Sequence, residues 1–344
     1  MQAMVVAIKA DIEGVNVSRI ATSCGIALEI AETEVETEGE CYVSLESLRL
    51  TAKSTDEKVK LEKDGKFLRV SAASWKASLK VIESSEIINS INSEGLTKTL
   101  DQGKIDAGMQ DLVKIFERVS PAADAKGTRE KGLFKSVAFI PNPNGLTVVS
   151  TDARRFHFET VQWAVPNPVI LPLECEASLC KIIGKEDGRI MMEIGEGSIR
   201  ATGPGFKVFF PLFEPRFPNL TAFLNIETWK SEFTCNREEL KSALSNALPF
   251  HSEGTVQITS EKKKLSIAST GQTEDRYDTS IKCQHDGTMD IFVNATYLLN
   301  ALSINQTESV TVKMGAAGTD VIAIKEGASM AVIGLMRFLT PPAK

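Results

Sequence analysis

The feature that most constrains the fold of this chain is a pattern that occurs three times along its 344 residues. Each copy begins with two runs of alternating apolar residues separated by a short polar turn, which is the pattern of a β-hairpin. The three hairpins are MVVAIKADIEGVNVSRIATS from Met4, SVAFIPNPNGLTVVSTD from Ser136 and TVQITSEKKKLSIASTG from Thr255. Because matching positions lie about 119 to 132 residues apart, the period is too long for a solenoid and indicates tandem homologous domains.

A second pattern follows each hairpin, and it consists of a strand, a short helix, another hairpin and a closing strand. In the middle copy it begins at VILPLECEASLCKIIGK, where Leu179, Ile182 and Ile183 have helical spacing and Gly184 is a natural helix end. The sequence therefore predicts an α+β fold of three domains, at residues 1–95, 96–222 and 223–344.

The middle copy has an amphipathic segment ahead of its first hairpin. Its apolar residues fall at steps of four and three, which predicts one helix face made of Ile105, Met109, Leu112, Phe116 and Val119.

The third copy has a similar segment, in which Asn236 and Glu239 have the spacing of a capping box. The expected apolar stripe of this helix is Leu240, Ala243, Leu244, Ala247 and Leu248. Because no such segment precedes Met4, the first domain is expected to lack its first strand and first helix.

Composition excludes several classes of protein. No apolar run of about 18 residues is present, and the start has no basic region before an apolar core, so we expect a cytoplasmic protein without a signal peptide. The six cysteines lack zinc-site spacing and are expected to be reduced thiols, with no metal and no cofactor. A net charge of −6 argues against a generally basic nucleic-acid coat, although positive charge can still gather on one face.

The segment VVSTDARRFHF, from Val148 to Phe158, clusters an acid, a histidine and two arginines. An enzyme could use Asp152 and His157 as an acid–base pair, with Arg154 and Arg155 holding an anion. No nucleophile or metal set accompanies them, and strand alternation points His157 away from its aromatic neighbours. We therefore expect no catalytic residues and no enzyme.

Four motifs resemble those of the bacterial replicative sliding clamp, the β clamp. GLTVVSTDARRFHF resembles the clamp's middle-domain signature, and EPRFPNL resembles the join between its middle and last domains. VNATYLLNAL resembles the entry to the last-domain helix, and AVIGLMRF resembles the closing strand. All four occur in the family's order, so the resemblance extends from about Met4 to Phe338.

The resemblance implies a DNA clamp fold, with hairpin-rich sheets outside and helices on the inner face of a ring. Clamps of this family are head-to-tail homodimers that encircle double-stranded DNA without reading its sequence, and they tether the replicative DNA polymerase and other factors. Partners, including the clamp loader that opens the ring, bind through short linear peptides in a pocket. The resemblance thus implies a polymerase processivity factor.

The resemblance also implies three sets of site residues. The peptide-binding pocket would consist of Phe134, Thr151, Ala153, Arg154, Arg155, Phe156, Pro218, Phe223, Asn294, Tyr297, Val332, Gly334, Leu335, Met336 and Arg337. Phe156 and Phe223 would anchor the peptide, and Arg155 and Arg337 would form the polar rim. The DNA-facing cations would be Arg49, Lys53, Lys114, Arg118, Lys126, Arg129, Lys131, Lys181, Lys185, Arg237 and Lys241. The dimer interface would involve Leu48, Trp75, Ala77, Leu79, Ala247 and Leu248.

The chain also departs from the family's pattern. Ala153 stands where glycine is usual, Arg154 stands where histidine is common, and Gly334-Leu335 replaces the usual Met-Pro. Such changes fit a diverged clamp, for example one encoded by a phage. The short first domain favours an alternative function, a clamp-like scaffold or decoy that binds clamp-interacting peptides without encircling DNA. Pocket residues such as Phe156, Pro218 and Val332 could also be ordinary interdomain core.

Overall fold

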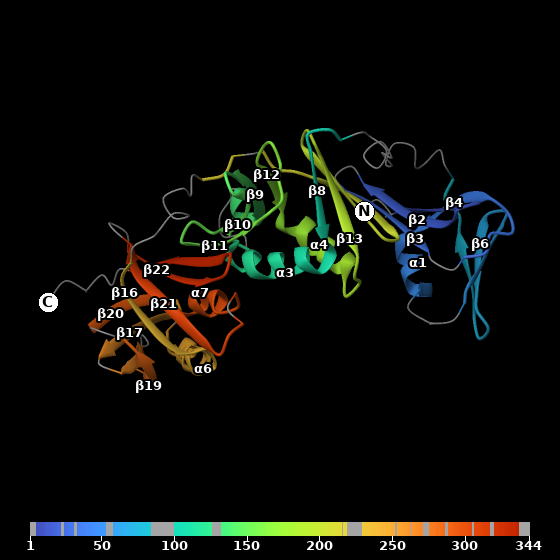
Figure 1. The fold of residues 1–344 in the computed structure, drawn as a ribbon. Helices are drawn as coiled ribbons and strands as arrows, with labels where there is room; N and C mark the ends of the chain where they lie inside the picture. The colour runs from blue at the N-terminus through green and yellow to red at the C-terminus, as the bar shows by residue number, and fades with distance from the viewer. Residues whose placement is uncertain are drawn as a thin grey trace. The chain divides into compact units, whose positions relative to one another are not determined.

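The structure is a computed structural model (Figure 1). It describes residues 5–21, 24–30, 33–52, 58–83, 100–125, 132–214, 216–218, 229–251, 253–261, 263–270, 275–285, 288–304, 306–316 and 320–336. The chain divides into two compact units, of which the first contains Met1–Gln110 and Leu179–Leu212 and the second contains Asp111–Ser178 and Phe213–Lys344.

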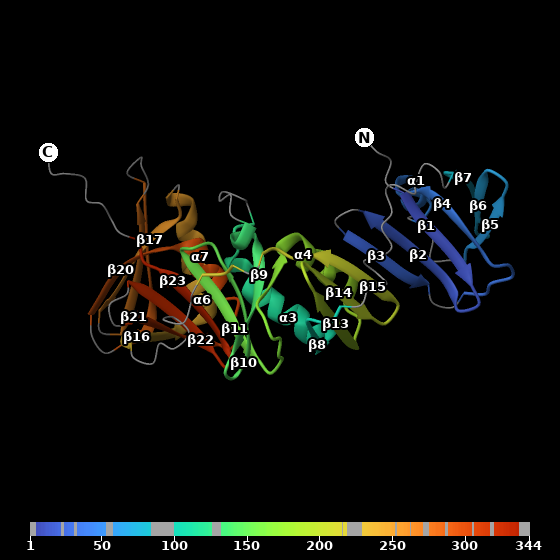
Figure 2. The ribbon, with the colours of Figure 1, turned by 90° about the horizontal axis from the view of Figure 1, so that it is seen from above.

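The first unit contains an eight-stranded antiparallel sheet in the order β4-β1-β2-β3-β15-β14-β13-β8 (Figure 2). Its strands are β1 Val5–Asp11, β2 Gly14–Ala21, β3 Cys24–Ile30, β4 Gly39–Ser44, β8 Gly103–Gly108, β13 Arg189–Gly195, β14 Ser198–Gly203 and β15 Phe206–Pro211. A second sheet has three strands, β5 Lys60–Asp64, β6 Phe67–Ser71 and β7 Lys76–Lys80. Helix α1, Leu45–Ala52, follows β4. Val6, Ile8, Val43, Leu68 and Val70 are among the residues that form a core between these sheets.

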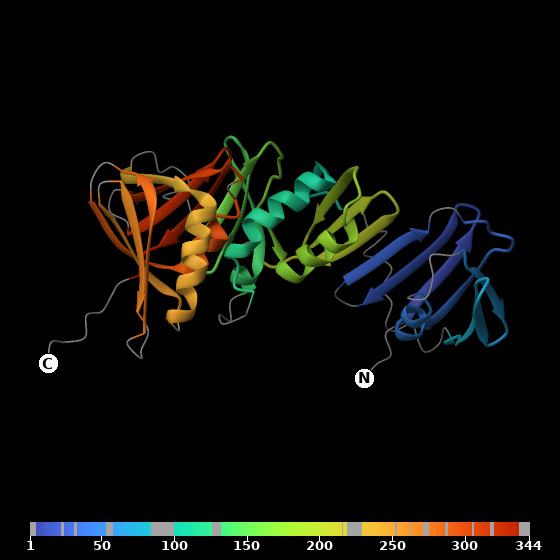
Figure 3. The same cartoon turned by 90° about the horizontal axis from the view of Figure 1, so that it is seen from below.

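The second unit contains a twelve-stranded sheet in the order β12-β9-β10-β11-β23-β22-β21-β16-β19-β18-β17-β20. Its strands are β9 Ser136–Asn142, β10 Gly145–Thr151, β11 Arg155–Val161, β12 Val169–Pro172, β16 Trp229–Asn236, β17 Thr255–Glu261, β18 Lys264–Thr270, β19 Arg276–Gln284, β20 Thr288–Asn294, β21 Ser309–Ala316, β22 Val321–Glu326 and β23 Ser329–Gly334. Helices α6, Arg237–Ala247, and α7, Ala295–Ala301, pack against each other, and α6 also packs on β18 and β19 (Figure 3). Short 3-10 helices are η2 Ser120–Ala122, η3 Gly132–Lys135 and η4 Leu248–Phe250.

Two further helices, α3 (Met109–Val119) and α4 (Leu173–Ile183), each begin in one unit and end in the other. Gly184 ends α4 as predicted, with φ of +56° and its N–H bonded to the Cys180 carbonyl.

The three predicted hairpins are confirmed as β1–β2, β9–β10 and β17–β18. Each hairpin recurs in the same four-strand order, which is β4-β1-β2-β3, β12-β9-β10-β11 and β20-β17-β18-β19. The α+β fold class is therefore confirmed.

The two large sheets join parts of neighbouring copies. In the first unit β3 of the first copy pairs with β15 of the second, and in the second unit β11 of the second copy pairs with β23 of the third. The compact units therefore do not follow the division at 1–95, 96–222 and 223–344, which stays a prediction.

The amphipathic segment of the second copy is a strand followed by a helix, so the prediction that Ile105 lies on the helix was wrong. Ile105 belongs to β8, and α3 begins only at Met109, directly after Gly108. Ile105 is nevertheless buried, as are Leu112 and Phe116 on α3. Ile105 on the strand lies four residues before Met109 on the helix, which is also a helical spacing. The spacing of apolar residues therefore did not show where the strand ends and the helix begins.

The helix predicted for the third copy is confirmed as α6. The Asn236 side chain caps it by accepting hydrogen bonds from the backbone N–H groups of Glu238 and Glu239, each at 3.0 Å. Its apolar residues Leu240 and Leu244 are fully buried in the core of the second unit.

Candidate functional site

The turn between β10 and β11 is held by its own side chains. Thr151 Oγ1 donates to the Arg155 carbonyl at 2.6 Å and accepts from the Ala153 N–H at 3.0 Å. Asp152 Oδ1 accepts from the N–H groups of Arg154 at 2.9 Å and Arg155 at 3.1 Å. This is an Asx-type turn, and it places Ala153 at φ +69°, a left-handed conformation that costs an alanine about 1 kcal/mol.

Arg155 links this turn to helix α7. Its Nε donates to Asp152 Oδ2 at 3.1 Å, and its guanidinium carbon lies 4.2 Å from the centre of the Tyr297 ring. Burial, followed by the charge of Asp152, raises the pKa of Tyr297. Since the Arg155 side chain is only 8% exposed, it supports the tyrosine ring from within the protein.

Asn294 holds the start of α7. Its Oδ1 accepts from the Tyr297 N–H at 3.1 Å, and its Nδ2 donates to the Glu253 carbonyl at 2.8 Å. Both ends of the amide are therefore used to fix Tyr297 and Glu253.

The end of β23 completes the site. The Gly334 N–H donates to the Arg154 carbonyl at 2.8 Å, and the Met336 N–H donates to the Phe292 carbonyl at 2.8 Å. A Cβ atom at position 334 would lie 3.1 Å from the Arg154 carbonyl oxygen, so glycine permits this close approach of β23 to the turn.

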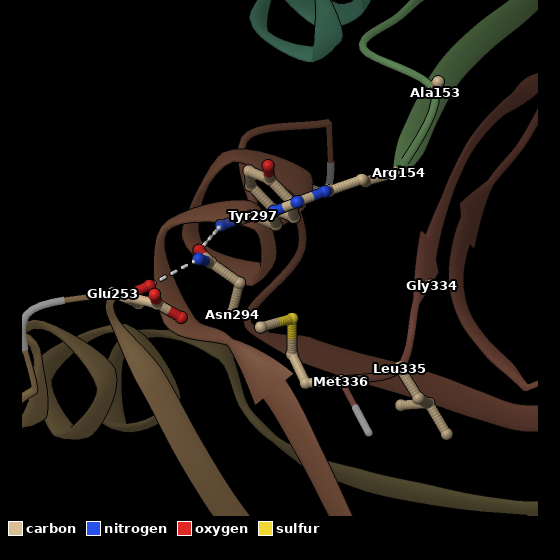
Figure 4. Close-up of a pocket in the computed structure, with 8 residues that line it drawn as sticks. All are labelled: Ala153, Arg154, Glu253, Asn294, Tyr297, Gly334, Leu335 and Met336. Carbon is tan, nitrogen blue, oxygen red and sulfur yellow. Dashed lines mark hydrogen bonds between the residues drawn. The ribbon is translucent and has the colours of Figure 1, made fainter. Parts of the chain in front are cut away.

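Together these elements enclose a pocket of about 580 Å³ (Figure 4). It is lined by Ala153, Arg154, Glu253, Asn294, Tyr297, Gly334, Leu335 and Met336. Apolar side chains and a tyrosine ring surround it, with one cationic and one anionic side chain, and it falls within the size range of small-ligand sites.

The structure brings together about half of the residues predicted for the pocket, and every lining residue except Glu253 was predicted. Glu253 lies in the turn before β17, where no sequence pattern marks it, and its link to the site is the long-range hydrogen bond from Asn294. Sequence reasoning missed it for that reason.

Two predicted roles in the pocket were wrong. Phe156 is 7% exposed because it packs with Phe158 and Val332 in the core between β11 and β23, so it supports the pocket rather than anchoring a ligand. Arg155 is turned inward to Asp152 and Tyr297 and does not form the rim. Phe223 and Arg337 lie outside the described residues.

The remaining predicted pocket residues do not line the site. Thr151 and Val332 are buried, Phe134 is half-buried in η3, and Pro218 is exposed.

The geometry does not support an acid–base pair of Asp152 and His157. His157 is fully buried, and its Nδ1–H donates to the Arg118 carbonyl at 3.0 Å. Burial lowers its pKa to about 4. The Asp152 carboxylate is occupied by the turn and by Arg155, so the two side chains serve different structural partners.

The predicted DNA-facing cations fall into three groups. Exposed side chains are Arg49 on α1, Lys114 on α3, Lys181 on α4 and Lys185 just beyond α4. Ion-paired side chains are Arg118 with Glu159 and both Arg237 and Lys241 with Glu238. Residues outside the described part of the chain are Lys53, Lys126, Arg129 and Lys131.

Arg118 is the cation whose surroundings differ most from the prediction. Its Nε and Nη2 each donate to a Glu159 oxygen at 2.6 Å, and Ser329 Oγ donates to the same carboxylate at 2.9 Å. A guanidinium neutralised in this way joins α3 to β11 and β23.

The predicted dimer-interface residues mostly pack within their own units. The Leu79 side chain is 7% exposed and Ala247 is fully buried, so both side chains pack inside their own units, and a contact with a partner stays a prediction. Leu48, Trp75 and Ala77 pack against the core between the two sheets of the first unit, and Leu248 packs against the core of the second.

Within the described ranges, no group of three or more His, Cys, Asp and Glu side chains could hold a metal ion. No helix among the described residues has the length and apolar character needed to cross a membrane.

Comparisons with known proteins agree with the sequence motifs. No family model matches the chain. The Beta sliding clamp of Pseudomonas putida is 23% identical over 284 residues, which cover 79% of this chain and 74% of that protein. The Beta sliding clamp of Pseudomonas aeruginosa is 23% identical over 176 residues, covering 49% of this chain and 48% of the relative.

Solved structures extend the likeness to nearly the whole chain. The crystal structure of the DNA polymerase sliding clamp from Pseudomonas aeruginosa has a TM-score of 0.85 at 18% identity and covers 98% of this chain and 92% of that one. A sliding clamp from the same organism bound to griselimycin has a TM-score of 0.85 at 17% identity, with the same coverage. The prediction that the chain is not an enzyme agrees with these names, since the relatives are clamps. The resemblance of this chain to the bacterial sliding clamps is therefore confirmed, and the chain has the clamp fold.

Proposed function

We propose that the chain is a DNA sliding clamp, a processivity factor that encircles duplex DNA and holds the replicative polymerase, the clamp loader and other factors through short linear peptides. The pocket formed by the Ala153–Arg154 turn, α7 and the end of β23 carries this proposal. It occurs on a chain whose fold matches solved clamps over 98% of its length, and one of those clamps binds griselimycin. A protein that works on chromosomal DNA in a bacterium would act in the cytoplasm.

The strand pairing supports a homodimer. In both large sheets the third strand of one copy pairs with the closing strand of the next copy, as β3 does with β15 and β11 with β23. By the same rule β19 would pair with the closing strand of a following copy. The strand β7 closes the first copy, and among the described strands it pairs only with β6. Pairing of β19 with β7 of a second chain, at both ends, would close a head-to-tail ring.

In this arrangement the dimer interface consists of backbone hydrogen bonds between the edges of β19 and β7, in addition to contacts between side chains. Over Arg276–Lys282, β19 pairs with β18 on one side, and its pairs with β16 are confined to Cys283 and Gln284. The free backbone groups of such an edge are a template for another strand.

DNA contact would come from cations that hold phosphates without reading bases. The exposed residues Arg49, Lys114, Lys181 and Lys185 are the best candidates, because their side chains form no ion pair with any described residue. Arg118 would contribute to the fold instead, through Glu159.

Ring closure is tested by solution mass together with retention on DNA. A clamp dimerises, stays on a nicked circular plasmid and leaves the plasmid once it is linearised. A chain that is monomeric at micromolar concentration, or that is released equally from circle and linear DNA, contradicts an encircling clamp.

A matched pair of proline variants tests the strand-edge interface. Neighbouring N–H groups of a strand point in opposite directions. Of the two variants Thr279→Pro and Ser280→Pro, one therefore removes an N–H that bonds to β18, and the other removes an N–H on the free edge of β19. We expect one variant to lose thermal stability and the other to keep it but become monomeric. Two variants that both remain dimers contradict the strand-edge interface.

The alternative is a clamp-like scaffold or decoy that binds the same peptides without encircling DNA. One observation favours it, since the sheet β5-β6-β7 has three described strands where the corresponding sheet portions, β15-β14-β13-β8 and β23-β22-β21-β16, have four. A monomer that still binds peptides would support this alternative.

A further inference from the structure

The polar groups of the pocket are divided between those already used by the fold and those that face a ligand. Asn294 has both ends of its amide engaged, with the Tyr297 N–H and the Glu253 carbonyl. The Gly334 N–H is bonded to the Arg154 carbonyl. These groups fix the walls of the pocket, and they are not available to select a ligand.

Two charged side chains remain. Arg154 and Glu253 are both exposed, and neither side chain has a hydrogen-bond or ion-pair partner within the part of the chain that the structure describes. The nearest carboxylate in sequence, Asp152, cannot neutralise Arg154, because its two oxygens bond the turn N–H groups and Arg155.

The two charges lie at opposite ends of the pocket (Figure 4). Arg154 extends from the β10–β11 turn toward Tyr297, and Glu253 lies beyond Asn294 on the other side. Asn294 lies between them in this view, and the side chains of Tyr297, Leu335 and Met336 supply the apolar lining of the pocket. A ligand in the pocket therefore meets a cation at one end, an anion at the other end and three apolar or aromatic lining side chains.

We propose that this pocket selects a dipolar peptide, whose acidic side chain binds Arg154, whose apolar middle packs on Tyr297, Leu335 and Met336, and whose basic side chain binds Glu253. The proposal rests on the proposed function, since it names the class of peptide that this site takes. Arg154 suits a carboxylate because its planar guanidinium can bond both oxygens. Glu253 offers only acceptor atoms and suits a lysine or arginine.

The charges supply selectivity rather than most of the affinity. Ion pairs between exposed side chains are weak and are screened by salt, so each end is worth roughly two- to fivefold in affinity. Selectivity is the difference in affinity between two peptides. A peptide with its charges reversed places like charges together at both ends of the pocket and therefore binds more weakly.

The test uses an array of pentapeptides with three randomised apolar core positions. The two end positions of the peptide are Asp first and Lys last in one set, Lys first and Asp last in a second set, and Gln at both ends in a third. The best cores are resynthesised with fluorescein, and their affinities are measured by fluorescence polarisation at low and high salt. We expect one charged order to bind about fivefold or more tightly than the Gln-flanked peptide at low salt, and the reversed order to bind more weakly than it.

Charge reversal in the protein gives the decisive comparison. Glu253→Lys should remove the preference at the basic end of the peptide, and the double variant Arg154→Glu with Glu253→Lys should favour the reversed peptide. Glu308→Lys and Lys264→Glu make equal charge changes at exposed positions outside the pocket and should leave the order of preference unchanged.

The outcomes separate the two proposals. Equal affinity for all flanks, with binding of the Gln-flanked peptide intact, overturns the dipolar selectivity and leaves the peptide pocket standing. Failure of every peptide in the array to bind overturns both the pocket and its selectivity, while ring closure is judged separately by retention on circular DNA.

Discussion

Neighbouring copies are joined by two strand pairs, β3–β15 in the first unit and β11–β23 in the second, which we call the first and second joints. They occupy the same place in two sheets of the same strand order, and they differ in the side chains on the paired strands. The registers of the two joints correspond. In the first joint Leu28 pairs with Phe206 and Ile26 pairs with Val208. At the matching positions of the second joint Glu159 pairs with Ser329 and His157 pairs with Ala331. At these positions the first joint is apolar, and its Leu28 is 41% exposed. The second contains a buried carboxylate and a buried imidazole.

The polar groups of the second joint are nearly all engaged. Glu159 bonds Arg118 and Ser329, and His157 Nδ1 bonds the Arg118 carbonyl, so α3, β11 and β23 share one network. The pocket lies at the Arg155 end of the same strand. Strand pairing alone is thus enough to connect two copies, whereas the connection next to the binding site also has a polar network and a turn held by its own side chains.

Removing the arginine of the network should have the largest effect. Arg118→Ala leaves the mostly buried Glu159 without its counter-ion, and we expect a loss of about 3 kcal/mol in the free energy of unfolding of the second unit. Urea unfolding, with hydrogen exchange at β11 and β23, measures this loss.

Two further variants sharpen the result. Leu28→Ala at the matching position of the first joint should cost less than about 1 kcal/mol, because its side chain is partly exposed. Converting the network to an apolar joint, with Arg118→Met, Glu159→Leu and Ser329→Ala, should recover most of the stability. An Arg118→Ala cost no greater than that of Leu28→Ala contradicts a stabilising role for the network.

The second joint should also be weakened by acid. His157 has its pKa lowered from 6.5 to about 4 by burial, so the unfolded chain binds more protons than the folded one between these values. Stability is then complete above about pH 6.5 and falls by roughly 3 kcal/mol as pH falls to 4. The imidazole's contribution is obtained from urea unfolding of the wild type and of His157→Ile, which carries the residue type of the first joint.

Above about pH 6.5, where the wild-type imidazole is neutral in both the folded and the unfolded chain, His157→Ile should be less stable by about 1 kcal/mol, because it loses the hydrogen bond to the Arg118 carbonyl. Its dependence on pH between 6.5 and 4 should nevertheless be weaker than that of the wild type, since both proteins keep the same carboxylates. Parallel curves for the two proteins would show that His157 does not titrate in this window.

The smallest effect concerns the turn that leads into the second joint. Ala153→Gly should stabilise the protein by about 0.5 to 1 kcal/mol, because glycine adopts φ +69° without the steric cost that alanine bears. Ala27→Gly in β3 is the matched control and should destabilise by a similar amount, since a strand glycine loses more entropy on folding. Changes of the same sign in thermal unfolding would contradict strain at Ala153.

Local patterns determined much of this protein from sequence alone. Alternation of apolar residues predicted the hairpins β1–β2, β9–β10 and β17–β18, and Asn236 and Gly184 predicted helix ends, because caps and turns depend on neighbouring residues. The family motifs predicted seven of the residues that line the pocket, since the turn after β10, the start of α7 and the end of β23 are each short local segments.

The tertiary structure decided everything that depends on pairing between distant segments. The joining of β11 to β23 placed Phe156 in a core, and Arg118 pairs with Glu159 of β11 instead of being left exposed. Packing of other distant segments buried Leu79 and Ala247. The hydrogen bond from Asn294 across 41 positions brought Glu253 into the pocket. The physical reason is that the spacing of apolar residues indicates which face of a helix or strand is buried. Whether a charged side chain is neutralised or faces a ligand depends on which distant segment pairs with its own, and local spacing does not contain that information.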